Sequence, residues 1–147
     1  MKSYYSCIDT KFVRYLPQPL QHLVVGDKAA KLGGKVVFYT SEDFGTYDYH
    51  GIIRAKIEEK PKMDGIIFFS LSQFFNNGKL NMEFMKFILN HGYEVHFARE
   101  NISIQDEEAL NKIFPMLYAQ QYVYSRDEPR SYWKPVWNEV EKEKVTS

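Results

Sequence analysis

The side chains of this 147-residue chain that could do chemistry stand directly after four apolar stretches. They include carboxylates, hydroxyls, an amide and a guanidinium, which are groups that bind polar ligands and transfer protons. Two carboxylates in one pocket can divide acid and base roles when their environments differ. We therefore take Glu42, Glu100 and Ser70 as candidate catalytic residues. The candidate ligand-binding residues at the same places are Asp9, Ser41, Ser72, Arg99 and Asn101.

A strand over residues 65–70 is expected to position the serines. The stretch Gly65-Ile66-Ile67-Phe68-Phe69 carries no charge and no polar alternation, which is typical of a strand covered on both faces. The chain then changes abruptly to Ser70, Ser72 and Gln73. Open α/β sheets place their ligands at the carboxyl ends of such strands.

Four strands alternate with four helices in the predicted fold. The strands are expected at residues 4–8, 35–39, 65–70 and 93–98, and the helices at 17–32, 49–59, 80–90 and 103–118, with Pro115 kinking or breaking the last helix. This alternation predicts a single-domain, three-layer α/β/α fold with a four-stranded parallel sheet in the order 2-1-3-4, as in flavodoxin-like folds. The domain is expected to span residues 1–121. Residues 122–147 would form an aromatic extension, anchored by Trp133 and Trp137, that packs on the domain or on a partner.

The helix that begins near Pro17 would bring an anion-binding end to the same edge, because the first backbone amides of a helix lack partners. Gln18 and Gln21 would point toward this edge and are further candidate ligand-binding residues. Residues 99 and 100 would point in opposite directions on leaving a strand, so only one should face the pocket, and we favour Glu100. Two plainer interpretations stay open: strand ends are polar because loops are polar, and Arg99 simply pairs with a carboxylate.

Composition and motifs exclude several classes of protein. The 19 basic residues balance 19 acidic ones, so the positive charge typical of a nucleic-acid binder is missing. The single cysteine, Cys7, excludes a disulfide framework, and the four histidines lack ligand spacing, so no metal site is expected. Dinucleotide, P-loop and nucleophile-elbow motifs are absent, and no cofactor is assigned. Without an apolar leader or spanning run, the protein is expected to be cytoplasmic.

The predicted layout resembles the catalytic domain of the serine recombinases, the resolvase and invertase family, over residues 4–121. That family carries Tyr-Ala-Arg-x-Ser at its first strand, where this chain reads Tyr5-Ser6-Cys7-Ile8-Asp9. Cys7 stands at the position of the arginine, and Asp9 at that of the nucleophilic serine. The segment Ser70-Leu71-Ser72-Gln73 also lacks the arginines that follow the third strand in the family. The resemblance therefore implies a resolvase-like architecture that does not cut DNA.

A closer resemblance is to the sporadically distributed carbohydrate-cluster proteins of bacteria, which occur among lipopolysaccharide and capsule biosynthesis genes. It spans about residues 16–121. The blocks that carry it are Leu16-Pro17-Gln18-Pro19-Leu20-Gln21-His22-Leu23-Val24-Val25, Ser41-Glu42, Asp64-Gly65-Ile66-Ile67-Phe68-Phe69-Ser70-Leu71 and His96-Phe97-Ala98-Arg99-Glu100-Asn101. The resemblance implies a setting of nucleotide-sugar or glycan-precursor metabolism.

Three functional hypotheses follow. In the first, a small cytosolic protein of surface-carbohydrate biosynthesis binds a sugar-like or phosphorylated ligand at the carboxyl edge of its sheet, with or without turnover. In the second, the chain is a non-enzymatic oligomeric scaffold that binds a partner or its own dimer mate through residues 122–137. In the third, it is a catalytically dead, recombinase-like nucleic-acid binder, which predicts salt-dependent binding to duplex DNA.

Overall fold

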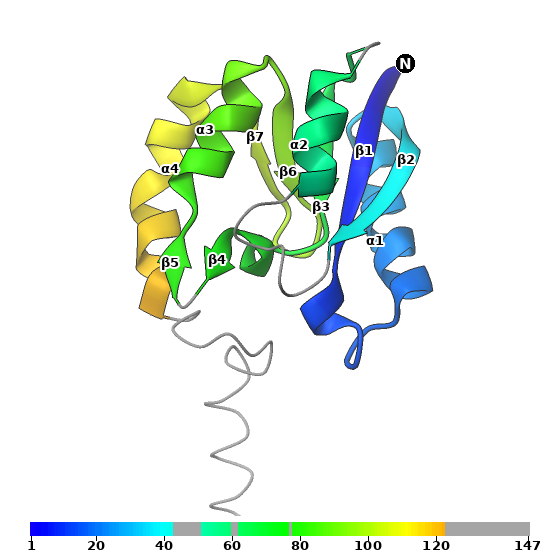
Figure 1. The fold of residues 1–147 in the computed structure, drawn as a ribbon, viewed down its shortest axis with the longest axis horizontal. Helices are drawn as coiled ribbons and strands as arrows, with labels where there is room; N and C mark the ends of the chain where they lie inside the picture. The colour runs from blue at the N-terminus through cyan, green and yellow to red at the C-terminus, as the bar shows by residue number, and fades with distance from the viewer. Residues whose placement is uncertain (43–50, 60–61, 77, 123–147) are drawn as a thin grey trace, which may run out of the picture.

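A five-stranded mixed sheet forms the centre of the fold in a computed structural model that describes residues 1–42, 51–59, 62–76 and 78–122 (Figure 1). Its strands are β1 (Lys2–Asp9), β2 (Gly34–Glu42), β3 (Gly65–Phe68), β6 (Glu94–Phe97) and β7 (Ile102–Ile104). They lie in the order β2-β1-β3-β6-β7. The pairs β1–β2, β1–β3 and β3–β6 are parallel, so four carboxyl ends meet at one edge.

The fifth strand corrects the predicted four-stranded, all-parallel sheet. β7 pairs with β6 in antiparallel fashion, directly after a turn in which Asn101 takes a φ of 56°. Asparagine tolerates this left-handed conformation better than most residues, which lets the chain reverse within a few residues. The last helix therefore begins later than the predicted residue 103. It starts after Asp106, whose carboxylate accepts a hydrogen bond from Ala109 N–H at 2.8 Å.

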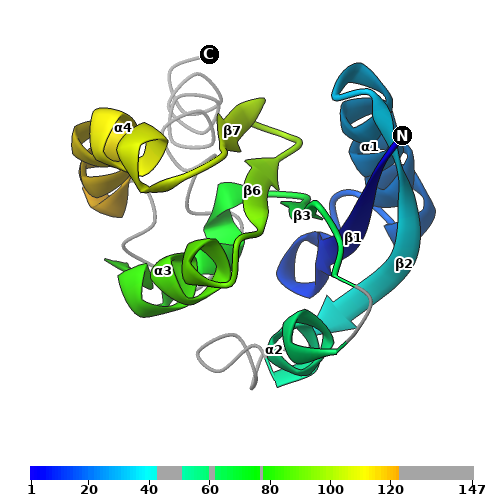
Figure 2. The same ribbon diagram turned by 90° about the horizontal axis from the view of Figure 1, so that it is seen from above.

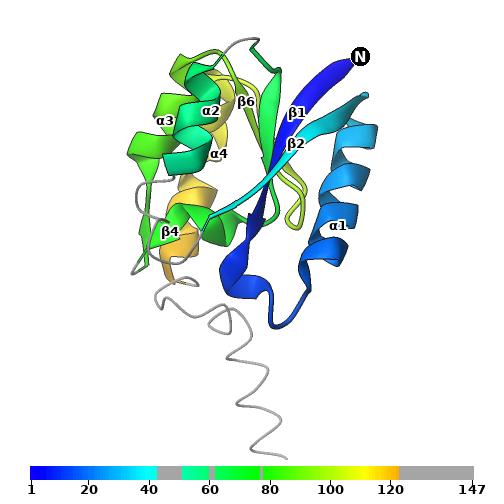
Figure 3. The same ribbon diagram turned by 45° about the vertical axis from the view of Figure 1, so that its right-hand side comes forward.

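Helices cover both faces of the sheet. Helix α1 (Gln18–Lys31) lies on one face, whereas α2 (Gly51–Glu58), α3 (Met82–Asn90) and α4 (Glu107–Ala119) lie on the other (Figures 2 and 3). The prediction of an α/β protein is thus confirmed. Helix α4 continues through Pro115, which neither ends nor interrupts it. No helix in the described part of the chain is long and apolar enough to cross a membrane.

β3 is the buried centre of the sheet, as the sequence predicts. Ile66 and Phe68 belong to the larger core cluster beneath α2, α3 and α4, while Ile67 and Phe69 belong to the smaller one beneath α1. The ring of Phe68 meets three other phenylalanine rings with centroids 4.7–6.1 Å apart. Aromatic pairs at such distances stabilise a core beyond their buried area.

Short elements shape the edge of the sheet where the candidate residues lie. A 3-10 helix, η1 (Thr10–Phe12), follows β1, and a second one, η3 (Leu71–Phe74), follows β3. A small hairpin of β4 (Phe75–Asn76) and β5 (Lys79–Leu80) then leads into α3, and η4 (Gln120–Tyr122) follows α4. The proposed aromatic extension, including Trp133 and Trp137, lies outside the described residues apart from its first residue, Tyr122.

Candidate functional site

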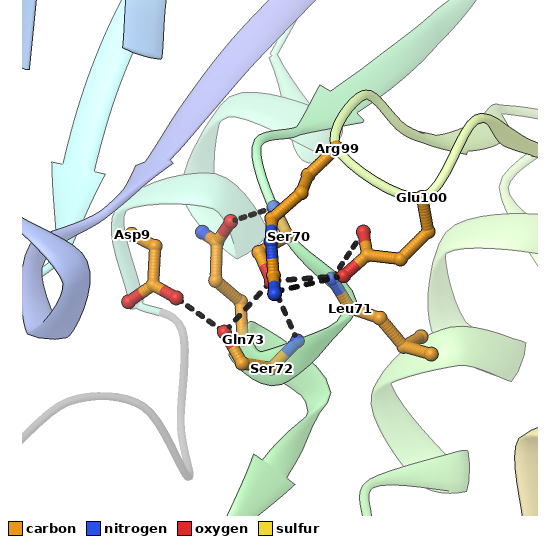
Figure 4. A network of polar contacts seen from close by, with 7 residues as sticks. All are labelled: Asp9, Ser70, Leu71, Ser72, Gln73, Arg99 and Glu100. Carbon is orange, nitrogen blue, oxygen red and sulfur yellow. Dashed lines mark hydrogen bonds and ion pairs between the residues drawn. The ribbon is translucent and has the colours of Figure 1, made fainter. Parts of the chain in front are cut away.

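Ser70 is the centre of a buried polar cluster at the carboxyl edge of the sheet (Figure 4). Its side chain caps η3, because its Oγ accepts a hydrogen bond from Ser72 N–H at 3.2 Å. The same hydroxyl lies 3.1 Å from Glu100 Oε2 and accepts from Arg99 Nη1 at 3.2 Å. Ser70 thus combines a structural capping role with contacts to two charged side chains.

Two serine hydroxyls link two carboxyl groups from opposite sides of the cluster. Ser72 Oγ donates to Asp9 Oδ2, and Ser70 Oγ donates to Glu100 Oε2. The two serine oxygens are 3.0 Å apart. Asp9 is fully buried, so its carboxyl group contacts the hydroxyl of Ser72 rather than open solvent. Asp9, Ser72, Ser70 and Glu100 are therefore linked by successive close contacts between oxygen atoms, with each serine hydroxyl donating outward to a carboxyl group.

Glu100 has the environment of an acid–base group. Burial raises the pKa of its carboxyl above the ordinary value, although hydrogen bonds from Leu71 N–H and Ser70 and the charge of Arg99 oppose the rise. Leu71 N–H donates to Oε1 at 3.0 Å, and Arg99 Nη1 lies 3.3 Å from Oε2. The side chain is still 20% exposed, so a ligand can reach it. A carboxyl with a raised pKa at an accessible position is suited to general acid or base catalysis.

Arg99 and Glu100 both face the cluster, which corrects the expectation that only one of them would. β6 ends at Phe97, so residues 99 and 100 belong to a turn and the alternation of a strand no longer governs them. Arg99 N–H donates to the carbonyl of Phe69 at 2.8 Å, which ties this turn to the end of β3. Both side chains then reach the hydroxyl of Ser70.

Two buried glutamines hold the loops around the cluster. Gln73 accepts from Ser70 N–H at 3.0 Å and donates to the carbonyl of Ile8 at 3.0 Å, which joins the ends of β3 and β1. Gln21 accepts from Asp9 N–H at 2.8 Å and donates to the carbonyl of Asp9 at 3.0 Å. Its side chain is thus bound to backbone groups, and it positions Asp9.

A pocket of about 470 Å³ lies beside the cluster, on the α1 face of the sheet. Its volume falls within the range of small-molecule sites. Arg99 is part of its wall, and the guanidinium carbon lies 5.0 Å from the centre of the Phe12 ring, a cation–π contact. The other lining residues are aromatic or aliphatic: Phe12, Tyr15, Leu16, Val24, Phe69 and Ala98.

The remaining predicted site residues take no part in the hydrogen bonds of the Ser70 cluster, or have side chains that the structure does not describe. Gln18 is exposed at the start of α1, and Ser41 is exposed on β2. Glu42 pairs with Asp9 in the strand register, which brings its backbone to the same edge, while its side chain lies outside the described residues. Asn101 lies in the turn before β7, where its side chain accepts from Lys28 Nζ at 2.8 Å.

The apolar lining of the pocket is the part of the site that the sequence interpretation did not find. Phe12 and Tyr15 stand in a polar loop, and an aromatic residue in a loop is a signal for a binding surface that could have been used. Leu16 and Val24 look like ordinary core positions of an amphipathic helix. Among the described residues no group of three or more potential metal ligands gathers.

Comparison with protein-family models and with curated proteins finds no match to this chain.

Proposed function

We propose that this protein binds a small sugar-like or phosphorylated molecule at the carboxyl edge of its sheet, as part of surface-carbohydrate biosynthesis. One observation carries the proposal: an aromatic pocket of about 470 Å³ shares Arg99 with a buried cluster that contains Glu100. The biosynthetic setting comes from the resemblance to bacterial carbohydrate-cluster proteins, and the resolvase-like architecture is part of the same proposal.

The pocket suits a ring that has one apolar face and one polar edge. Tyr15, which is exposed, offers an aromatic surface on which a sugar or base ring can stack, while Phe12 and Phe69 line the pocket as almost fully buried rings. Arg99, which is 26% exposed, offers a planar set of N–H donors to a phosphate or carboxylate bound in the pocket. A ligand of this kind would place its polar edge next to Glu100.

Glu100 is the group we propose for proton transfer to such a ligand. Its raised pKa keeps a proton available closer to neutral pH than an ordinary glutamate would. Ser70, whose hydroxyl donates to Glu100, would hold this carboxyl group in place for the transfer. Binding requires Arg99 and the rings, whereas turnover would in addition require Glu100.

A binding measurement with matched variants tests this proposal. We expect nucleotide sugars or sugar phosphates to raise the melting temperature of the wild-type chain and to bind in titration calorimetry. Arg99→Met should weaken binding by about tenfold to a hundredfold, which is the loss of one charge-assisted hydrogen bond. Lys112→Met removes the same charge from an exposed position of α4 and should leave binding unchanged.

Two results would contradict the proposal. One is the absence of binding by nucleotide sugars, sugar phosphates and free sugars alike. The other is equal binding by the wild type and a folded Arg99→Met variant. A Glu100→Gln variant that binds as the wild type does, but releases no product from a bound ligand that the wild type converts, would identify Glu100 as the acid–base group.

A further inference from the structure

A second set of reactive side chains lies on the α1 face of β6 and β7, away from the Ser70 cluster. His96 and Ser103 are direct partners in the antiparallel pairing of these strands. Because side chains two apart in a strand share a face, Glu94 lies on the same side as His96. His96 Nδ1 is 2.8 Å from Ser103 Oγ, and His96 Nε2 is 2.8 Å from Glu94 Oε1. A hydroxyl, an imidazole and a carboxylate thus form one connected chain.

The direction of the hydrogen bonds in this chain follows from the charge of its members. Hydrogen bonds from His96 and Lys2 lower the pKa of Glu94 and outweigh the opposing effect of its burial. An ionised carboxylate only accepts hydrogen bonds, so His96 Nε2 carries the hydrogen. Burial lowers the pKa of His96, which keeps the ring neutral and leaves Nδ1 as an acceptor. Ser103 must therefore donate its hydroxyl proton to His96.

Neighbouring groups hold the imidazole in this orientation. The ring of Tyr4 meets the ring of His96 edge-on, with centroids 5.4 Å apart, and Tyr4 OH donates to Glu94 at 3.2 Å. Lys2 Nζ donates to the other carboxylate oxygen of Glu94 at 2.9 Å. His96 itself is fully buried, whereas Ser103 is only partly buried. The base is therefore fixed and shielded, and the hydroxyl stands at its outer end.

Lys28 supplies a positive charge on the same face. Its ammonium group donates to Asn101, two residues before Ser103, and its charge contributes to the lowered pKa of His96. The titratable groups that face the imidazole are thus Glu94 on its own strand, Lys2 and Tyr4 on β1 and Lys28 on α1. Lys28 thus brings a cation to the turn that directly precedes β7, the strand that carries Ser103.

We propose that Ser103 is a nucleophile for acyl transfer, with His96 as its general base and Glu94 as the residue that orients the base. Ser103 Oγ would attack the carbonyl carbon of a carboxylic ester while its proton moves to His96 Nδ1. Collapse of the tetrahedral intermediate would break the bond to the alcohol, which takes the proton from His96. A water molecule, deprotonated by His96, would then release the acid and restore the serine.

A fluorophosphonate probe tests this proposal on the full chain. Such a probe forms a bond from phosphorus to the serine oxygen and expels fluoride, so it reports the nucleophile without a known substrate. We expect one label per wild-type chain, located on Ser103 by peptide mass spectrometry. Ser103→Ala should reduce labelling to background, while Ser3→Ala, a serine on β1 outside the chain of contacts, should label as the wild type does.

Variants of the base separate a reactive serine from a structural hydrogen bond. His96→Gln and Glu94→Gln should each slow labelling by about a hundredfold or more, while thermal melting shows a folded chain. The proposal is overturned if the folded wild type takes no label, if the label resides on Ser70 or another serine, or if a folded His96→Gln variant labels at the wild-type rate. Each of these results leaves the ligand proposal for the Arg99 pocket untouched.

Discussion

Replacing Gln73 by leucine is the sharpest test of how the candidate site is held together. The side chain is 1% exposed and has a size close to that of leucine, so the change mainly removes hydrogen bonds. It deprives Ser70 N–H of its acceptor and the carbonyls of Cys7 and Ile8 of an amide donor. The two segments that this amide joins carry Asp9 and Ser70.

The expected cost can be worked out bond by bond. A buried N–H left without a partner costs about 1–3 kcal/mol, and each hydrogen bond lost from a group that keeps another partner costs about 0.5–1.5 kcal/mol. The carbonyl of Cys7 keeps a partner, because it also accepts from Phe69 N–H at 3.0 Å. The gain from burying leucine offsets part of the loss. We expect Gln73→Leu to lower the free energy of unfolding by roughly 2–5 kcal/mol.

Urea denaturation followed by circular dichroism measures this difference. Gln18→Leu is the matched control, because Gln18 is exposed at the start of α1 and its replacement should change stability by less than about 0.5 kcal/mol. Ligand binding by a folded Gln73→Leu chain should also fall, since Ser70 would lose its position. A loss of stability no larger than that of the control would refute the role given to Gln73.

Four further predictions concern pH and packing. The pKa of Glu100 is raised in the folded chain, so its contribution to stability is present below pH 4.5 and is lost as pH rises through the folded pKa. The wild type should therefore lose stability relative to Glu100→Gln as pH rises through this range, and urea denaturation at a series of pH values measures the difference. The pKa of His96 is lowered in the folded chain, so its contribution to stability is present above pH 6.5 and is lost as pH falls through the folded pKa. In the same measurements, His96→Gln should lose less stability than the wild type as pH falls. Gly65→Ala would place a Cβ 2.7 Å from the carbonyl oxygen of Glu94, and calorimetry should show that the free energy of unfolding falls by roughly 1–3 kcal/mol. An unchanged free energy of unfolding would mean that β3 and β6 can move apart to make room for the methyl group. Phe68→Ala should cost about 3–5 kcal/mol by denaturation, and a cost below 1 kcal/mol would mean that its ring does not fill the core.

The fold class could be predicted because the relevant signals are local. The uncharged run from Gly65 to Phe69 indicates a strand with both faces covered, and β3 is indeed buried on both faces of the sheet. β7 was missed because Ile102–Ile104 is only three residues long and directly precedes the helical pattern of α4. Such a short strand is stabilised by its pairing with β6 more than by its own composition, which makes it invisible to local pattern analysis.

The candidate site, too, was only partly predictable from the sequence. Strand ends predicted that Asp9, Ser70 and Glu100 would meet, because the carboxyl ends of parallel strands share an edge. The role of Gln21 could not be predicted, since its side chain bonds to the backbone of Asp9, and a backbone partner leaves no trace in the sequence. The contacts between Glu94, His96 and Ser103 depend on the register of β6 and β7, which the sequence pattern left undefined.

β2, one of the two edge strands of the sheet, carries an irregularity that affects how the sheet meets other chains. β2 has a neighbour on one side only among the described residues, and its register against β1 shifts between Tyr4 and Tyr5. An edge strand with a free row of backbone groups invites another strand to add to the sheet, whereas a bulge twists that row and breaks its spacing. The irregularity at Val37 therefore opposes edge-to-edge growth of the sheet and disfavours aggregation by strand addition at this edge.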